Sequence, residues 1–202
     1  HSQSHDHKNQ LVKIYNPKKF LIEKQKNFFW KTIFNKRMII KLIKCFIQFQ
    51  NFSKNYSDYS KSFKRCENLL SRWYSTKKVV DLKKKYEIEN NIEFDLVMLT
   101  RLDMAYFSKF EFEKISKKKL TVPNHNDVGG PRNNYQVQIK KNNRTLEKGI
   151  SDFWFISSSK NIDRFSRLYD FFSNYNISSH VSSFQHAKFL NLDLNFYKFR
   201  GI

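Results

Sequence analysis

The stretch Ile92-Glu-Phe-Asp-Leu-Val-Met-Leu-Thr-Arg-Leu-Asp-Met-Ala-Tyr-Phe107 decides the fold that the sequence predicts. Its first half, residues 94–99, is a short apolar run with a β-branched centre. This pattern is typical of a strand buried on both faces, as in parallel sheets. The run ends in Thr100-Arg101-Leu102-Asp103. Because ligands of open α/β sheets bind just beyond the carboxyl ends of the strands, Arg101 and Asp103 are candidate site residues.

Arg101 and Asp103 are two positions apart, so on an extended backbone their side chains point to the same side. A carboxylate there can hold a divalent metal ion or a sugar hydroxyl, and a guanidinium can clamp a phosphate with two hydrogen bonds. The alternative is an ion pair that only orders the end of the strand. The residues alone leave both interpretations open.

The chain of 202 residues carries 38 Lys and Arg against 18 Asp and Glu, a formal net charge of +20. Its length fits a single domain, 1–202, with a substantial core. The basicity suits anionic ligands such as nucleotides or phospholipid surfaces. The lysines are spread along the whole chain, so the charge is only a weak indication of nucleic-acid binding. Cys45 and Cys66 form no metal motif, and we expect a reducing, cytoplasmic location.

Periodicity predicts alternating strands and helices along the chain. A helix is predicted over residues 62–90, either continuous or broken near Tyr74. Residues 55–64 are predicted to form a loop, and residues 124–148 a mobile loop that acts as a lid. Further strands are predicted at Leu11–Tyr15, Phe20–Glu23, Leu120–Val122, Phe153–Ile156 and Leu194–Phe199, and further helices at Asn161–Asn174 and His180–Leu190.

The segment Trp30–Phe52 is rich in Ile, Phe and Lys. Its densest apolar part, Met38–Phe49, is interrupted by Lys41 and Lys44 and is shorter than the ~20 apolar residues that span a bilayer. One interpretation is a helix that lies on a membrane surface. The other, which the pattern favours, is a helix packed on the core with its lysines in water.

Several segments together resemble a known family. Ser71-Arg-Trp-Tyr-Ser75, Leu82-Lys-Lys-Lys-Tyr-Glu87 and the strand ending in Arg101-Leu-Asp103 are similar to glycosyltransferases of the GT-A type that viruses, phages and bacteria use to build surface polysaccharides. Ile150-Ser-Asp-Phe-Trp-Phe-Ile-Ser-Ser158 resembles the second hallmark of that family, an Asp that opens a strand. His1-Ser-Gln-Ser4, Tyr15-Asn-Pro-Lys18 and Glu23 resemble the segment after its first strands.

The resemblance implies a GT-A-like, Rossmann-like α/β fold with a mixed, mainly parallel sheet flanked by helices. It also implies that the first βα unit is missing, so that the chain is N-terminally incomplete. Family members transfer a sugar from a nucleotide-sugar donor to a glycan or lipid-linked acceptor, and a carboxylate at the end of a central strand holds Mn²⁺ or Mg²⁺ on the diphosphate. Asp103 matches that carboxylate. Arg101 departs from the family's Asp-x-Asp, and an Arg can neutralise phosphate without a metal.

On the acceptor side, the resemblance matches Asp152 to a general base that takes the proton of the acceptor hydroxyl. The alternative is an Asp that caps a turn and orders the lid. His125, Asp127 and His180 are further candidate acceptor contacts. His180 and His186 lie six apart, on different faces of one helix, so they would not chelate one metal ion. For His186 we expect a buried, hydrogen-bonded role.

A second hypothesis is a basic protein without catalysis that binds nucleic acid or an anionic membrane. Its aromatic residues fall at the spacing of a hydrophobic core, and the chain contains no recognisable nucleic-acid module. The sequence therefore favours the enzyme, with peripheral membrane contact compatible with it because acceptors of such enzymes are often lipid-linked.

Overall fold

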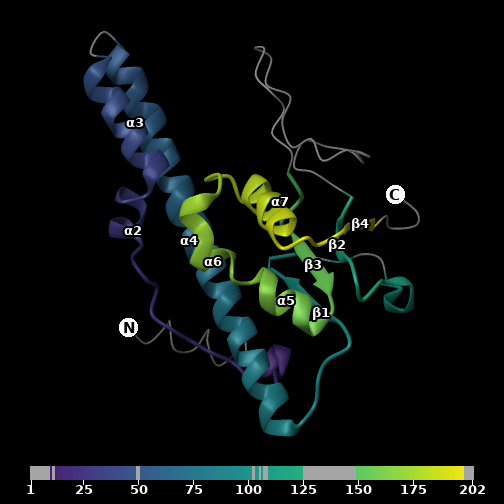
Figure 1. The fold of residues 1–202 in the computed structure, drawn as a ribbon. Helices are drawn as coiled ribbons and strands as arrows, with labels where there is room; N and C mark the ends of the chain where they lie inside the picture. Colours follow the sequence, from purple (N-terminus) through teal and green to yellow (C-terminus); the bar gives the residue numbers. More distant parts are fainter. Residues whose placement is uncertain are drawn as a thin grey trace.

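A computed structural model describes residues 10, 12–48, 51–101, 103, 104, 106, 109–124 and 149–197. A four-stranded sheet lies beside a layer of helices, and the long helix α4 extends well beyond the sheet (Figure 1). The mixed α/β class is confirmed. The strands are β1 (Val97–Thr100), β2 (Leu120–Pro123), β3 (Trp154–Ser157) and β4 (Leu194–Tyr197); the helices are α2 (Phe29–Ile33), α3 (Lys36–Ile47), α4 (Phe52–Asn90), α5 (Ser159–Phe165), α6 (Leu168–Phe171) and α7 (Ser179–Phe189), with short 3₁₀ turns η2 (Phe112–Lys114) and η3 (Phe172–Asn174).

The strands of the sheet are ordered β1-β3-β2-β4. β3 runs antiparallel to both of its neighbours, and β2 and β4 run parallel. The predicted mixed sheet is confirmed, but its mainly parallel character is wrong for the described strands, since two of their three pairings are antiparallel. An apolar run shows that a strand is buried; the strand's direction depends on connections that the run does not encode.

β1 lies at an edge of the sheet rather than at its centre. Residues 97–99 are partly buried and Thr100 is exposed. The prediction of a strand buried on both faces is therefore wrong for β1. The strands that are buried at every position are β2 and β3. An edge strand and a central strand can have equally apolar sequences. Only the order of the strands in the sheet shows that β1 is the edge strand.

The two faces of the sheet are covered differently. Neighbouring residues of a strand point to opposite faces. Phe155 packs with the helices: the ring centroid of Trp73 in α4 lies 6.1 Å from that of Phe155 and 5.4 Å from that of Phe165 in α5. Trp154 faces the other way and packs with Ile115, in the segment that follows η2. The main core thus lies between the sheet and the helices α4, α5 and α7.

α4 is one continuous helix of 39 residues. The predicted helix over residues 62–90 is confirmed, unbroken at Tyr74, but the predicted loop over residues 55–64 is wrong. Ser62 is buried and accepts a 2.6 Å hydrogen bond from Lys41 Nζ of α3. Packing against α3 therefore keeps these polar turns helical, which local propensity alone does not show. The helix ends at Asn91, whose left-handed φ of 51° is a common C-terminal stop.

α3 packs along the first half of α4 through Met38 and Cys45, both buried. Its first turn is capped by the Asn35 side chain, which accepts the backbone N–H of Arg37 at 3.0 Å. The core-packed interpretation of this segment is thus confirmed for one face of α3. Within the described residues, no helix combines the length and the apolar character needed to cross a bilayer.

The two short strands predicted near the start of the chain are not observed. Residues 12–15 are helical, and the N–H of Asn16 bonds the carbonyl of Val12 at 2.9 Å. Asn16 itself has a left-handed φ of 39°, which ends the turn. Residues 20–23 have no regular structure. Both predictions are wrong, because short alternating runs do not distinguish a strand from a short helix or an exposed connection.

Four predictions for the second half of the chain are confirmed within one residue over the described part, namely β2, β3, β4 and α7, and residues 198 and 199 of the last predicted strand lie outside the described residues. The helix predicted over residues 161–174 is instead divided into α5, α6 and η3. At the break, the Ser166 hydroxyl donates to the carbonyl of Asp163 at 2.9 Å. A side chain that donates to a backbone carbonyl in this way competes with the backbone N–H groups that would continue the helix.

Candidate functional site

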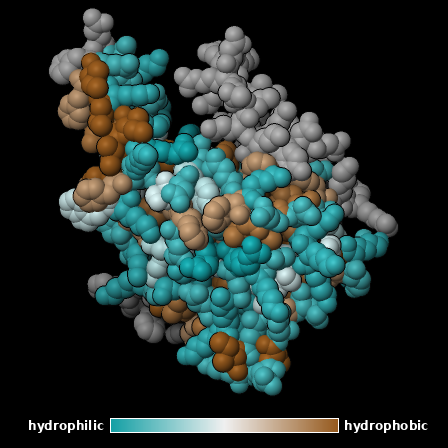
Figure 2. All heavy atoms as spheres, viewed as in Figure 1, coloured by the Kyte–Doolittle hydropathy of each residue, from teal (hydrophilic) through white to brown (hydrophobic). Residues whose placement is uncertain are grey.

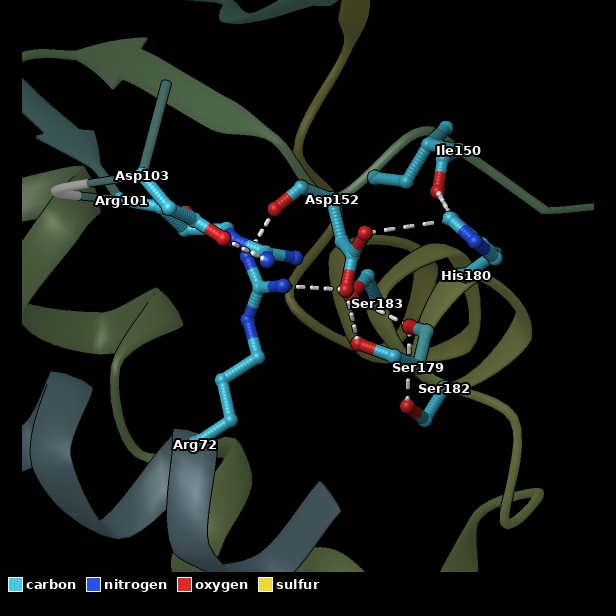
Figure 3. A network of polar contacts seen from close by, with 9 residues as sticks. All are labelled: Arg72, Arg101, Asp103, Ile150, Asp152, Ser179, His180, Ser182 and Ser183. Atoms are coloured by element: carbon cyan, nitrogen blue, oxygen red, sulfur yellow. Dashed lines mark hydrogen bonds and ion pairs between the residues drawn. The ribbon is translucent and has the colours of Figure 1, made fainter. Parts of the chain in front are cut away.

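The candidate site lies at the end of the sheet where β1 finishes and β3 begins. Thr100 pairs with Trp154 across the antiparallel ladder, so Arg101 and Asp103, which follow β1, lie at the same end as Asp152, which precedes β3. α7 begins beside Asp152, and the middle of α4 passes below it (Figure 3). The sheet therefore gathers four segments that are distant in the sequence.

Arg72 of α4 holds Asp152 in a forked ion pair. Its Nη1 donates to Asp152 Oδ2 and its Nη2 donates to the backbone carbonyl of Asp152. The two side chains are only 21% and 9% exposed. Burial lowers the pKa of the Arg72 guanidinium, an effect that the Asp152 carboxylate opposes and the nearby Arg101 increases. The sequence assigns no role to Arg72, although Arg72 lies inside the Ser71–Ser75 segment of the resemblance.

Asp152 also contacts the start of α7. The Ser179 hydroxyl donates to Asp152 Oδ2 at 2.5 Å, and His180 Nδ1 lies 3.5 Å from Asp152 Oδ1. The Ser179 carbonyl in turn accepts hydrogen bonds from the hydroxyls of Ser182 and Ser183, which stiffen the first turn of the helix. Asp152 thus links α4 to α7 and keeps one oxygen directed at a histidine, while the lid that it was predicted to order falls largely outside the described residues.

His180 is oriented by its neighbours. Its Nδ1 lies 3.1 Å from the carbonyl of Ile150, and the N–H of Ile150 bonds the carbonyl of His180 at 3.1 Å. A carbonyl only accepts hydrogen bonds, so Nδ1 carries the proton. In the neutral ring the lone pair therefore lies on Nε2, and Nδ1–H faces both Ile150 and Asp152. This arrangement of carboxylate, Nδ1–H and Nε2 is one that supports proton transfer at Nε2.

Arg101 and Asp103 contact each other, as their spacing predicts. Arg101 Nε donates to Asp103 Oδ1 at 2.8 Å and Nη2 donates to Oδ2. The pair is open to water, with the two side chains 43% and 62% exposed. Hydrogen bonds from Arg101 lower the pKa of the Asp103 carboxyl. Both residues also act electrostatically on Arg72, so the pair and the buried network form one charged cluster.

The donor set does not favour a resident metal ion at Asp103. Both carboxylate oxygens of Asp103 accept from Arg101, and among the described residues no three His, Cys, Asp or Glu side chains gather at one point. A cation would have to displace a guanidinium to reach Asp103.

The remaining predicted residues fall elsewhere. His125 and Asp127 lie outside the described residues. His186 is buried, 2.9 Å from the Tyr175 hydroxyl, and burial lowers its pKa to about 4. Its predicted structural role is confirmed.

Two other segments of the resemblance meet away from this site. The Tyr74 hydroxyl donates to Glu23 Oε2 at 2.8 Å, on the surface of α4. Lys26 lies 4.5 Å from the centre of the Tyr74 ring, a cation–π distance. Tyr74 thus anchors the connection that leads to α2 rather than joining the cluster around Asp152.

No family model, curated protein or solved structure matches the chain.

Proposed function

We propose that the protein is a glycosyltransferase that moves a sugar from a nucleotide-sugar donor to a glycan or lipid-linked acceptor. The observation that supports this function is the cluster of two arginines, two carboxylates and one histidine at one end of the sheet. Guanidiniums stabilise the phosphates of a leaving nucleoside diphosphate, and a carboxylate–imidazole pair takes the proton of an acceptor hydroxyl.

Arg101 is the phosphate-binding residue in this proposal. Its exposed guanidinium already makes a forked contact with Asp103, the geometry in which Arg also binds phosphate. Arg72 lies close enough for Arg101 to lower its pKa. Two neighbouring guanidiniums repel each other, so an anion that binds between them is stabilised by both. When the donor binds, Asp103 is released to a sugar hydroxyl.

The proton of the acceptor hydroxyl goes to the pair formed by His180 and Asp152. Asp152 Oδ2 is already occupied by Arg72 and Ser179, so we assign proton uptake to His180 Nε2. Asp152 then stabilises the imidazolium through Nδ1. As the proton leaves, the hydroxyl oxygen bonds to the anomeric carbon, and the carbon–oxygen bond to the diphosphate breaks with its electron pair.

The GT-A-like topology is part of the same proposal, supported by the charged residues that gather at the end of the sheet where β1 finishes. Mn²⁺ or Mg²⁺ on the donor diphosphate remains a prediction, which donor binding with and without Mn²⁺ tests. We expect the protein to act in the cytoplasm, where the buried thiols of Cys45 and Cys66 stay reduced.

Thermal unfolding with a panel of nucleotide sugars, each with and without Mn²⁺, tests the proposal. A ligand at a hundredfold over its dissociation constant adds about 2.7 kcal/mol, or roughly 5 to 11 °C in Tm for a chain of this size. Arg101→Gln should abolish the shift for the donor that binds. Arg65→Gln, which removes an exposed Arg elsewhere on α4, should leave it intact.

The acceptor side is tested by release of nucleoside diphosphate in the presence of an acceptor. His180→Gln should lower kcat by about 10²–10⁴-fold, the usual contribution of a general base, and leave the donor-induced Tm shift unchanged. If the chain unfolds cooperatively and no donor shifts its Tm, the proposal of a transferase is overturned. A shift that survives Arg101→Gln would remove Arg101 from the donor site.

A further inference from the structure

The outer face of α3 is apolar and exposed. Ile39, Ile40, Ile43, Phe46 and Ile47 are between 39% and 76% exposed. Their spacing places them on one side of the helix, because residues three, four and seven apart share a face. Figure 2 shows hydrophobic atoms gathered over α3, at the projecting upper left of the molecule. Contiguous apolar surface of this kind marks an interaction site.

The opposite face of α3 holds the helix in this orientation. Met38 and Cys45 are buried against α4, and Lys41 Nζ donates to Ser62 of α4 at 2.6 Å. The isoleucines of the outer face therefore point to water in the folded chain. A rotation that hid them would expose Met38 and Cys45 and break the lysine hydrogen bond.

The segment before α3 adds exposed aromatic residues. Trp30 and Phe34 are 68% and 69% exposed, and their rings are stacked with centroids 6.1 Å apart. Both come from α2 and the residue that follows it, directly before the N-cap of α3. An aromatic pair beside an apolar helix face is typical of proteins that lie in the headgroup region of a bilayer.

The charge of this region decides between possible occupants. Between Glu23 and Asp58 the sequence contains eight Lys and Arg and no acidic residue. Lys36, Arg37 and Lys44 of α3 are exposed beside the apolar face. A second copy of the chain would bring the same positive charge to the contact, whereas an anionic lipid surface is complementary to it.

We infer that the outer face of α3, with Trp30 and Phe34, docks on an anionic lipid bilayer. The isoleucines and Phe46 enter the boundary of the acyl chains, and the basic side chains contact lipid phosphates. The inference goes beyond the transferase and does not depend on it, since no residue of the charged cluster around Asp152 takes part.

Co-flotation of the 202-residue protein with lipid vesicles tests this inference. Vesicles of equal parts phosphatidylcholine and phosphatidylglycerol should carry the protein, and vesicles of phosphatidylcholine alone should carry much less. Ile47→Ser should weaken binding about ten- to a hundredfold, as expected for one large apolar side chain that leaves water. Ile88→Ser is the matched control, because Ile88 is 81% exposed at the far end of α4.

A second pair of variants tests the charge. Lys44→Gln should weaken binding to the anionic vesicles about fivefold, since each basic residue at such a surface contributes about 1 kcal/mol. Lys160→Gln, which removes an exposed lysine of α5, should change binding much less. Equal effects of Ile47→Ser and Ile88→Ser would overturn the inference. The inference would also be overturned if the parent protein bound neither kind of vesicle and light scattering showed a dimer that Ile47→Ser dissociates.

Discussion

Replacing Arg72 with Leu removes the cation that faces the buried carboxylate of Asp152, and we expect a large loss of stability. Removal of one partner from a buried ion pair costs about 3–5 kcal/mol, because the other charge stays desolvated. The side chains of Arg72 and Asp152 are 21% and 9% exposed, so both are largely removed from water. Asp152 keeps the Ser179 hydroxyl at 2.5 Å, which places the expected loss near the lower limit.

A loss of about 3 kcal/mol corresponds to a decrease in Tm of roughly 6 to 12 °C for a chain of about this length. Urea unfolding followed by tryptophan fluorescence measures it directly, since Trp73 and Trp154 are buried and report the loss of the core. The double variant Arg72→Leu with Asp152→Asn removes both charges. It should be less destabilised than the sum of the two single variants.

The pair Arg101–Asp103 provides the control. It has the same residue types as the pair Arg72–Asp152 and bonds both carboxylate oxygens, but it is exposed. Arg101→Leu should therefore leave the free energy of unfolding almost unchanged. If Arg72→Leu proves as harmless as Arg101→Leu, the carboxylate of Asp152 is not desolvated in solution, and the buried network does not organise the site.

Two further predictions concern the core. Burial lowers the pKa of His186 from 6.5 to about 4, so as the pH falls the unfolded chain binds the proton first. Stability should decrease between about pH 6.5 and pH 4, by about 3 kcal/mol in total, and a series of urea unfolding curves for His186→Gln should lack this part of the decrease. Leu70 of α4 is fully buried whereas Val79 is 56% exposed. Leu70→Ala should therefore cost about 2–5 kcal/mol, and Val79→Ala should stay within about 0.5 kcal/mol in the same assay.

Much of the local structure was predictable because its signals are local. The short strands β2, β3 and β4 and the helix α7 each lie within a dozen residues. The contact between Arg101 and Asp103 follows from their spacing of two. The buried role of His186 follows from the aromatic residues around it in the sequence, among them Phe189, whose ring stacks on the imidazole.

The long-range part of the site was not predictable in the same way. Arg72 and Asp152 are 80 positions apart, and no periodicity links them. A signal existed: Arg72 lies between the buried Leu70 and Trp73, and a charged residue beside the buried stripe of a helix needs a partner. The sequence does not tell which of the distant carboxylates supplies it.

The sequence by itself determined where β2, β3, β4 and α7 form, and which charged residues follow β1. Those properties depend on side-chain periodicity and on neighbours a few positions away. Only the tertiary structure decided that β1 is an edge strand, that β3 runs antiparallel to it, and that α4 continues through its polar turns. These features depend on contacts between distant segments, whose free energy is gained only when the whole chain packs. The antiparallel pairing is what brings Asp152 to the end of β1, and with it Arg72 and His180 to the residues that the sequence had singled out.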